Sequence, residues 1–268
     1  MEGAMIEGHR LNFAYGAEHV LRDVSFRVAT GQLTGILGAN GSGKTTLLRL
    51  AMGLLRPTSG TIRVAGQPPT EGDRRAFARL VAAVPQETPI EFPFTVGELV
   101  LLGRTPHIGV LGFESEADVA IANEAMRLCG IRELAGRPIT AVSGGELRRA
   151  FVARALAQQA QILLCDEPTA GLDIHHQVAL FELLRAEARA GRCVVVVVHD
   201  LNLAAAYCDH LLLLKQGRVV AEGPVAEVLT YRQVRAAFDV DVYVGVNDLT
   251  GSRFLIPMAD KADKKETP

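Results

Sequence analysis

One stretch, Gly-Ala-Asn-Gly-Ser-Gly-Lys-Thr at positions 38–45, constrains the fold of this chain more than any other feature. It follows an apolar run at residues 33–37 and precedes residues 45–54, where leucine recurs at helical spacing. Glycines let a backbone wrap a phosphate with its N–H groups pointing inward, and the following helix adds its positive end. Lys44 would reach the β- and γ-phosphates of a nucleotide, and the Thr45 hydroxyl would ligate Mg²⁺. Strand, loop and helix in this order predict a phosphate-binding loop.

Two more continuous apolar runs, at residues 162–165 and 193–198, resemble the run at 33–37. Such runs are typical of strands that are buried on both faces of a parallel sheet covered by helices. Helical patterns separate them, including residues 173–190, which end before a glycine. Strands that alternate with helices predict an α/β fold. Residues 11–15 and 24–28 predict short β segments near the start.

The composition limits the classes of function. With 268 residues, of which 49% are hydrophobic, and a net charge of −2, the chain is a globular protein with a sizeable core. A near-neutral net charge gives no electrostatic reason to expect that the chain binds nucleic acid. The four cysteines lack C-x-x-C spacing, which predicts buried thiols rather than a zinc or redox site. No apolar run approaches the ~20 residues that span a bilayer, and the first residues lack a signal-peptide core, so we expect a soluble cytoplasmic chain.

Two adjacent carboxylates, Asp166 and Glu167, end the apolar run at residues 162–165. Beside a nucleotide and its Mg²⁺, Asp166 would hold the metal and Glu167 would polarise the attacking water. A helix N-cap is the structural alternative, and it weakens once a phosphate loop lies upstream.

A third motif, Val-Ser-Gly-Gly-Glu at 142–146, precedes a helical pattern rich in arginine and alanine. Ser143 and Glu146 have the spacing of a capping box, which would make this simply a well-capped helix start. The same glycine-opened helix end with a serine hydroxyl would also bind a phosphate.

Taken in order, GANGSGKT, Gln86, VSGGE, ILLCDEP, AGLD and His199 resemble the nucleotide-binding subunit of an ABC transporter over about residues 5–230. The resemblance implies a P-loop NTPase core with a parallel sheet, an antiparallel β subdomain and a helical ABC-specific subdomain. We expect an ATPase domain at 1–240 with the helical subdomain at about 87–160, a small C-terminal β appendage at 241–258 and a charged tail at 259–268. ATP and Mg²⁺ are the implied cofactors.

The resemblance also implies site residues. Glu167, His199 and Gln86 would be catalytic, and Mg²⁺ would be held by Thr45, Gln86 and Asp166. The expected contacts of ATP are Tyr15, Gly38, Asn40, Gly41, Ser42, Gly43, Lys44, Thr45, Thr46, Ser143, Gly144, Gly145 and Asp173. Tyr15 could instead be a strand tyrosine that packs locally, Gln86 a loop residue without a role, and Asp173 a helix N-cap.

The sequence departs from the family pattern at two positions. Residues 142–146 match the signature motif of the family, which begins the helix that follows (the signature helix). Glu146 replaces the commoner glutamine of this motif, which leaves the role of this position open. Gly171 makes the sequence AGLD instead of SALD, and we expect a looser turn there.

The partners follow from the same resemblance. Because the chain carries one set of motifs, two copies would pair head to tail, and Ser143, Gly144 and Gly145 would contact ATP held by the other copy. The apolar, proline-containing segment after Gln86 either packs internally or receives a helix of an integral membrane permease. The permease would hold the chain at the cytoplasmic face of the membrane, with a substrate-binding protein as an indirect partner.

The transported cargo is suggested by two segments, FTVGELVLLGRTPH and VDVYVGVNDLTGSRFLIP. They resemble the ATPases of importers of iron-siderophores, haem and vitamin B12. A zinc or manganese importer, or a soluble ABC ATPase of cofactor assembly, is the alternative.

Overall fold

The computed structural model describes residues 5–86, 93–109 and 112–258. Within this part of the chain the strands form a six-stranded sheet in the order β5-β6-β7-β3-β8-β9, in which β9 is antiparallel to β8 and the other neighbours are parallel. Its strands are β3 (Leu33–Gly38), β5 (Val81–Val84), β6 (Ile162–Asp166), β7 (Cys193–Val197), β8 (His210–Lys215) and β9 (Arg218–Pro224). The predicted α/β class with a parallel sheet is confirmed.

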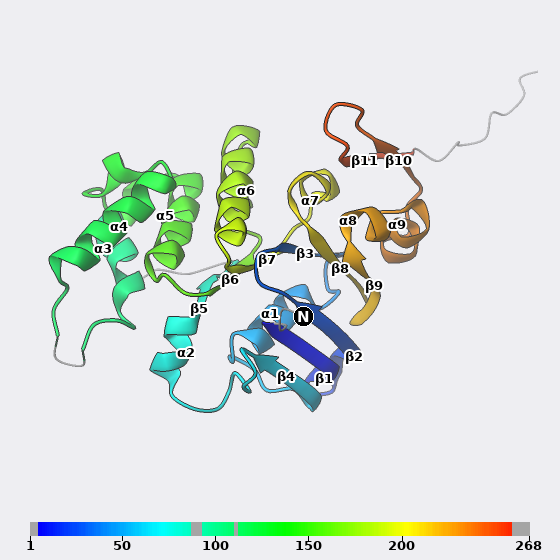
Figure 1. The fold of residues 1–268 in the computed structure, drawn as a ribbon, viewed down its shortest axis with the longest axis horizontal. Coiled ribbons are helices and arrows are strands. Elements are labelled where there is room, and N and C mark those ends of the chain that lie inside the picture. The colour runs from blue at the N-terminus through cyan, green and yellow to red at the C-terminus, as the bar shows by residue number, and fades with distance from the viewer. Residues whose placement is uncertain (1–4, 87–92, 110–111, 259–268) are drawn as a thin grey trace, which may run out of the picture.

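Helices cover both faces of this sheet (Figure 1). One face carries α5 (Gly144–Ala157), α6 (Ile174–Arg189) and α7 (Leu201–Tyr207), and the other carries α1 (Lys44–Ala51). Every residue of β3, β6 and β7 is buried, as the continuous apolar runs predict.

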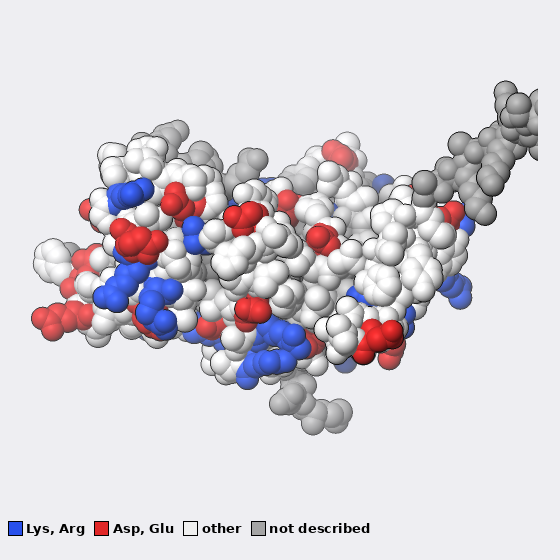
Figure 2. Space-filling view, turned by 90° about the horizontal axis from the view of Figure 1, so that it is seen from above, with Lys and Arg blue, Asp and Glu red and all other residues white. Residues whose placement is uncertain are grey.

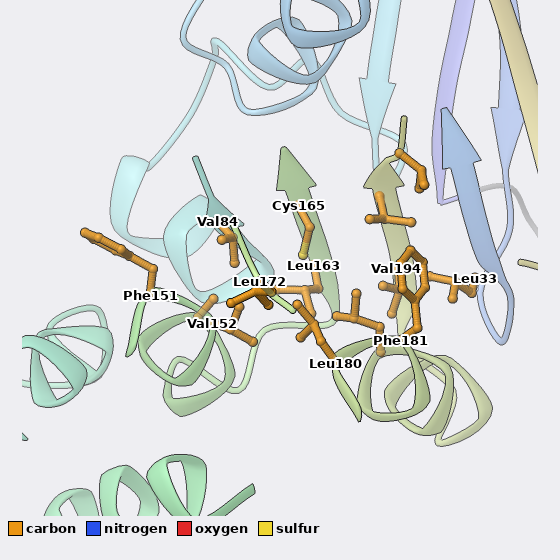
Figure 3. Packing of buried hydrophobic residues seen from close by; sticks show 14 of the residues in the cluster. Leu33, Val84, Phe151, Val152, Leu163, Cys165, Leu172, Leu180, Phe181 and Val194 are labelled. Carbon is orange, nitrogen blue, oxygen red and sulfur yellow. The ribbon is translucent and has the colours of Figure 1, made fainter. Parts of the chain in front are cut away.

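Alternate residues of these strands belong to two different cores. Leu163 and Val194 pack with Leu180 and Phe181 of α6 in one core (Figure 3), whereas Leu164 belongs to the core on the α1 side. Because both faces of the sheet are covered in this way, the carboxyl ends of its parallel strands are firmly placed.

A three-stranded antiparallel sheet, in the order β2-β1-β4, lies on the α1 side. Its strands are β1 (Ile6–Tyr15), β2 (Glu18–Val28) and β4 (Ser59–Val64). β1 and β2 are longer than the segments expected at residues 11–15 and 24–28, and β4 was not expected from the sequence. A short helix, α2 (Arg74–Leu80), leads from this sheet to β5.

Helices lie between β5 and β6, as the sequence predicts. They are α3 (Val96–Leu101), α4 (Glu116–Leu128) and α5, with short 3₁₀ turns η1 (Leu102–Arg104), η2 (Arg132–Leu134) and η3 (Ile139–Ala141). Thr95, Ser115 and Ser143 each begin a helix with a capping box. The expected apolar segment after Gln86 falls partly outside the described residues, since 87–92 are not among them.

The chain ends in two short helices and a hairpin. α8 (Val225–Val228) and α9 (Tyr231–Phe238) follow β9, and β10 (Val242–Val246) pairs with β11 (Arg253–Pro257). Val242 and Leu255 are buried in the core that α6 and α7 share, so the hairpin packs onto the body of the protein. The predicted charged tail at 259–268 lies outside the described residues, and the division of the chain at residue 240 stays a prediction.

The distribution of charge on the surface and the burial of the cysteines agree with the near-neutral net charge and the cysteine spacing of the sequence. Acidic and basic side chains intermingle on the face shown in Figure 2. All four cysteines are buried and free, as expected. In the described part of the chain, no helix combines the length and apolar character that a membrane crossing requires.

Candidate nucleotide-binding and hydrolysis site

The glycine-rich loop begins where β3 ends and finishes at the first residue of α1. Gly43 has a φ of +100°, and a Cβ atom at this position would lie 2.6 Å from Cδ2 of Leu21. A side chain is therefore excluded both by the backbone conformation and by the packing. The predicted order of strand, loop and helix is confirmed, with the helix beginning at Lys44.

Lys44 holds the loop in shape. Its Nζ atom donates hydrogen bonds to the carbonyl oxygens of Gly38 (2.9 Å) and Ala39 (3.0 Å). The side chain is buried, and this burial lowers the pKa of the ammonium group, although Glu167 and Asp166 oppose the shift. Lys44 thus places a positive charge inside the loop.

Asp166 lies at the buried end of β6, next to this charge. Burial raises the pKa of its carboxyl above the usual range, against a hydrogen bond from the Thr45 side chain that lowers it. The Oδ1 atom is buried without a hydrogen-bond partner among the described residues, and so is Oγ of Ser42 in the loop. Buried polar atoms without partners are uncommon, and these two lie in the loop and at the carboxyl end of β6, where a phosphate or a metal ion would supply a partner.

Three further side chains meet at the ends of neighbouring strands. Glu167 accepts a hydrogen bond from Nε2 of Gln86 (3.0 Å) through Oε2, and its Oε1 atom lies 2.5 Å from Nε2 of His199. These residues follow β6, β5 and β7, which are adjacent in the sheet. The carboxyl edge of a parallel sheet is where α/β proteins bind ligands.

The loop and these side chains line one pocket of about 670 Å³. Of the expected ATP contacts, it is lined by Tyr15, Asn40, Gly41, Ser42, Gly43, Lys44, Thr45 and Thr46, together with Gln86, Glu167 and His199. Glu18 and Val20 also line it and were not expected. Gly38 and Asp166 lie beneath it as buried residues.

Tyr15, at the end of β1, stands at the rim of the pocket and is 43% exposed. Its ring meets that of Phe13 edge-on at 4.8 Å, and its hydroxyl accepts from Arg49 at 3.5 Å. One face of the ring is thus supported by the strand while the side chain remains accessible, so both interpretations of Tyr15 fit its surroundings.

The signature residues lie outside this pocket. Ser143 is exposed at the N-cap of α5, where its Oγ atom accepts from the backbone N–H of Glu146. The Glu146 carboxylate accepts from the Ser143 N–H, which lowers the pKa of Glu146. The capping box is therefore present, and Glu146 has a structural role in it. Gly144 and Gly145 form the first turn of the same helix and are not among the pocket-lining residues.

Asp173 is the N-cap of α6 and also lies apart from the pocket. Its carboxylate accepts hydrogen bonds from the backbone and the ring of His176, which lower its pKa. Gly171, two residues earlier, has a φ of +75°, a conformation that favours glycine. Asp173 therefore serves as the helix N-cap, which was the alternative to an ATP contact. Its side chain is also exposed.

Arg148 is a residue that the sequence analysis did not single out. It is buried on α5, and its guanidinium donates to the backbone carbonyls of Pro85, Gln86, Asp166 and Glu167. The sequence shows only an arginine one turn inside a predicted helix. A local pattern of this kind does not reveal which groups the arginine contacts. Burial lowers the pKa of this guanidinium.

The residues present fit a Mg²⁺ ion that is bound together with a phosphate. Thr45, Gln86 and Asp166 offer oxygen atoms, which Mg²⁺ prefers, and Asp166 has an unpartnered buried oxygen. Among the described residues, no group of three or more His, Cys, Asp or Glu side chains could hold a metal alone. Few protein ligands are what a magnesium site completed by phosphate oxygens requires.

Comparisons with known proteins agree with this arrangement. Residues 21–170 match the family model described as ABC transporter. The chain is 42% identical over 252 residues to "Cobalamin import ATP-binding protein BtuD" of Halobacterium salinarum, covering 94% of this chain and 63% of that relative. It is 41% identical over 242 residues to "Hemin import ATP-binding protein HmuV" of Streptomyces coelicolor, covering 90% of this chain and 86% of the relative.

A solved structure described as the inward-facing conformation of a metal-chelate type ABC transporter matches with a TM-score of 0.83 at 28% identity. The match covers 96% of this chain and 99% of that one. On the family model, the identity to these relatives and the shared fold, the chain belongs to the ABC transporter family and is one of its ATP-binding proteins.

Proposed function

We propose that this chain is the ATP-hydrolysing subunit of an ABC importer for an iron-siderophore, haem or cobalamin-type cargo. The observation that carries the proposal is the convergence of Gln86, Glu167 and His199 on the phosphate loop within one pocket. A carboxylate, an amide and an imidazole beside a phosphate-binding loop can position and activate a water molecule for phosphoryl transfer.

ATP would enter the pocket with its adenine against the accessible ring of Tyr15. Its phosphates would be bound by the backbone N–H groups of residues 38–46 and by the positive end of α1. Lys44 already forms hydrogen bonds with two loop carbonyls, and it would turn part of its hydrogen-bonding capacity toward the β- and γ-phosphates. Gly38, Asn40, Gly41, Ser42, Gly43, Thr45 and Thr46 complete this loop.

Hydrolysis would depend on Glu167 as the base that accepts a proton from the attacking water. Gln86 and His199 each contact a different oxygen of its carboxylate and so orient it toward the phosphate side of the pocket. His199 would hydrogen-bond the γ-phosphate, and Gln86 would orient the water. Bound Mg²⁺, held by Thr45, Gln86 and Asp166, would neutralise charge on the phosphates.

A second copy of the chain would complete each site. Ser143, Gly144, Gly145 and Asp173 lie outside the pocket formed by their own chain, at helix starts that are accessible from outside. A head-to-tail pair with twofold symmetry would bring Ser143, Gly144 and Gly145 onto the γ-phosphate held by the partner, and Asp173 would link the two sites. The pair would close when ATP binds and reopen after hydrolysis, and this cycle would drive transport.

Transport would require partners that span the membrane. The names of the cobalamin and hemin relatives and the metal-chelate type transporter support an importer with a separate permease. We place the chain at the cytoplasmic face of the membrane, held by that permease, with a substrate-binding protein acting indirectly. The same names favour a chelate or tetrapyrrole cargo over the alternatives of free zinc or manganese ions and of cofactor assembly.

The decisive experiment is transport by the complex of this chain with its permease, reconstituted in proteoliposomes. Uptake of haem, ferric siderophore and cobalamin is measured in the presence of ATP and Mg²⁺, with zinc and manganese ions as comparison cargoes. We expect one chelate or tetrapyrrole cargo to stimulate ATP hydrolysis and to accumulate. Accumulation of free metal ions alone would support the zinc or manganese alternative instead of the proposed cargo class. Failure of the chain to form a complex with any integral membrane permease would favour cofactor assembly.

A further inference from the structure

Arg148 connects two loops that carry the proposed hydrolytic residues. Its Nη1 atom donates to the carbonyl oxygens of Pro85 (2.6 Å) and Gln86 (2.7 Å). Its Nη2 atom donates to the carbonyl oxygen of Asp166 (3.0 Å) and to that of Glu167. One buried side chain thus binds the backbone on both sides of the Gln86–Glu167 contact.

The Arg148 guanidinium can hold the two loops at a fixed distance from each other. A guanidinium is planar and presents its donors in a fixed fork, so it sets the distance and angle between the groups that it binds. Its partners are four neutral carbonyls, and its Nε atom has no partner among the described residues. Burying a charge in this way is unfavourable compared with an apolar side chain of similar volume. The arrangement is therefore better explained by geometry than by stability.

The backbone of Glu167 needs such support. Its φ of +50° lies in the left-handed region, which residues with a side chain rarely adopt. In this conformation the Glu167 carboxylate contacts both Gln86 and His199. The carbonyl of Glu167, which Arg148 binds, belongs to the same strained residue.

We propose that Arg148 is a positioning residue that fixes Gln86 and Glu167 relative to each other and ties them to the signature helix. Arg148 lies on α5, one turn after Gly144 and Gly145. Because a helix moves as a rigid rod over so short a distance, a displacement of its N-terminus by a nucleotide on the partner chain would shift Arg148. Each complete site would combine the pocket of one copy with the signature residues of the other. Contact of the signature residues with ATP at one site would thereby change the position of the Glu167 carboxylate at the other site. This communication between sites rests on the proposed function; the positioning of Glu167 does not.

The test compares Arg148→Gln with Arg149→Gln, the same change at the next position. Arg149 donates instead to the carbonyls of Cys129 and Gly130 at the end of α4, so its loss leaves the Gln86 and Glu167 loops untouched. Three quantities are measured in the full chain: ATP hydrolysis, equilibrium binding of ATP without Mg²⁺, and the ring ¹⁵N chemical shifts of His199, assigned with His199→Gln.

We expect Arg148→Gln to lower kcat between about tenfold and a hundredfold, because displacement of a catalytic group by about 1 Å has such effects. ATP binding should change by less than about twofold, since the phosphate loop is not touched. The His199 ring signals should shift, because Glu167 leaves its contact with the ring. Arg149→Gln should show none of these changes.

Arg148→Lys keeps the charge without the fork and serves if the glutamine variant does not fold. It should also lower kcat and shift the His199 signals. An unchanged kcat and unchanged His199 signals in the folded Arg148 variants, or equal changes in Arg149→Gln, overturn the proposal. If the native chain hydrolyses no ATP but the His199 signals still shift, the proposed function fails while the positioning role stands.

Discussion

The Nε2 atom of His199 lies 2.5 Å from Oε1 of Glu167, although the two residues are 32 positions apart in the sequence. The contact follows from the parallel pairing of β6 with β7, which brings the ends of these strands side by side. Gln86 binds the other carboxylate oxygen from the end of β5. The carboxylate proposed as the base is thus oriented by two side chains, and a third, Arg148, holds its backbone.

Glu167→Gln should abolish turnover while nucleotide binding survives. The amide has nearly the same shape but cannot accept a proton from water, so hydrolysis should fall by at least about a hundredfold. Phosphate release measures the loss, and size-exclusion chromatography with ATP should show a stable dimer. Glu124→Gln, which removes a carboxylate paired with Arg127 on the exposed face of α4, is the control. Turnover of Glu167→Gln at the native rate would exclude Glu167 as the base.

Lys44→Ala should weaken nucleotide binding itself. The ammonium group lies within the loop, and its loss removes charge-assisted hydrogen bonds to phosphate as well as those to Gly38 and Ala39. We expect affinity for a non-hydrolysable ATP analogue to fall by about tenfold to a hundredfold, measured by calorimetry. Lys215→Ala is the matched control, because the Lys215 ammonium contacts the carbonyl of Ala236 and the carboxylate of Asp239 rather than the loop carbonyls. Equal affinity in the native chain and Lys44→Ala would refute the assignment of the phosphate loop.

The doubly buried strands were predictable because their pattern is local. The runs at 33–37, 162–165 and 193–198 correspond to β3, β6 and β7, each with all residues buried. β1 and β2 extend beyond their predicted segments because pairing between strands, rather than alternation, decides their length. The register of β1 with β2 shifts between Gly8 and Leu11, and such irregularities interrupt the period of two that a sequence pattern needs.

The contacts of the candidate site were predictable only in part. Motif order pointed to Gln86, Glu167 and His199, and parallel strands account for their meeting. Arg148 could not be identified, because its four carbonyl partners lie 18 to 63 positions away and any backbone can supply a carbonyl. Side-chain identity marks a site in a sequence, whereas main-chain partners leave no such mark.

Asp118→Asn should destabilise the protein in a pH-dependent manner. Hydrogen bonds from Ser115 and then from Arg104 hold the pKa of the Asp118 carboxyl at about 2, below its ordinary 3.8. The folded chain therefore binds this proton more weakly than the unfolded chain does. The stabilisation is complete above pH 3.8 and disappears as the pH falls from there toward about 2.

Thermal unfolding measures this effect. The midpoint of Asp118→Asn should lie below that of the native chain at neutral pH, and the difference should shrink as the solution is acidified. Asp23→Asn is the control, because the Arg10–Asp23 pair is exposed and its atoms are 3.4 Å apart. A difference that stays constant with pH would contradict the role of the charged carboxylate.

Asn202→Leu should loosen the C-terminal hairpin from α7. The Asn202 amide donates to the carbonyl of Leu255 (3.2 Å) and accepts from its N–H (2.8 Å), so it completes the outer edge of β11. Leucine has a similar size but no polar atoms, and loss of the two bonds to buried Leu255 should lower the free energy of unfolding by about 1–3 kcal/mol. Urea unfolding measures this, and amide exchange at Leu255 should accelerate. Asn247→Ala, which alters only the turn of the hairpin, should leave exchange at Leu255 slow, and equal acceleration in both variants would show that Asn202 is not the attachment point.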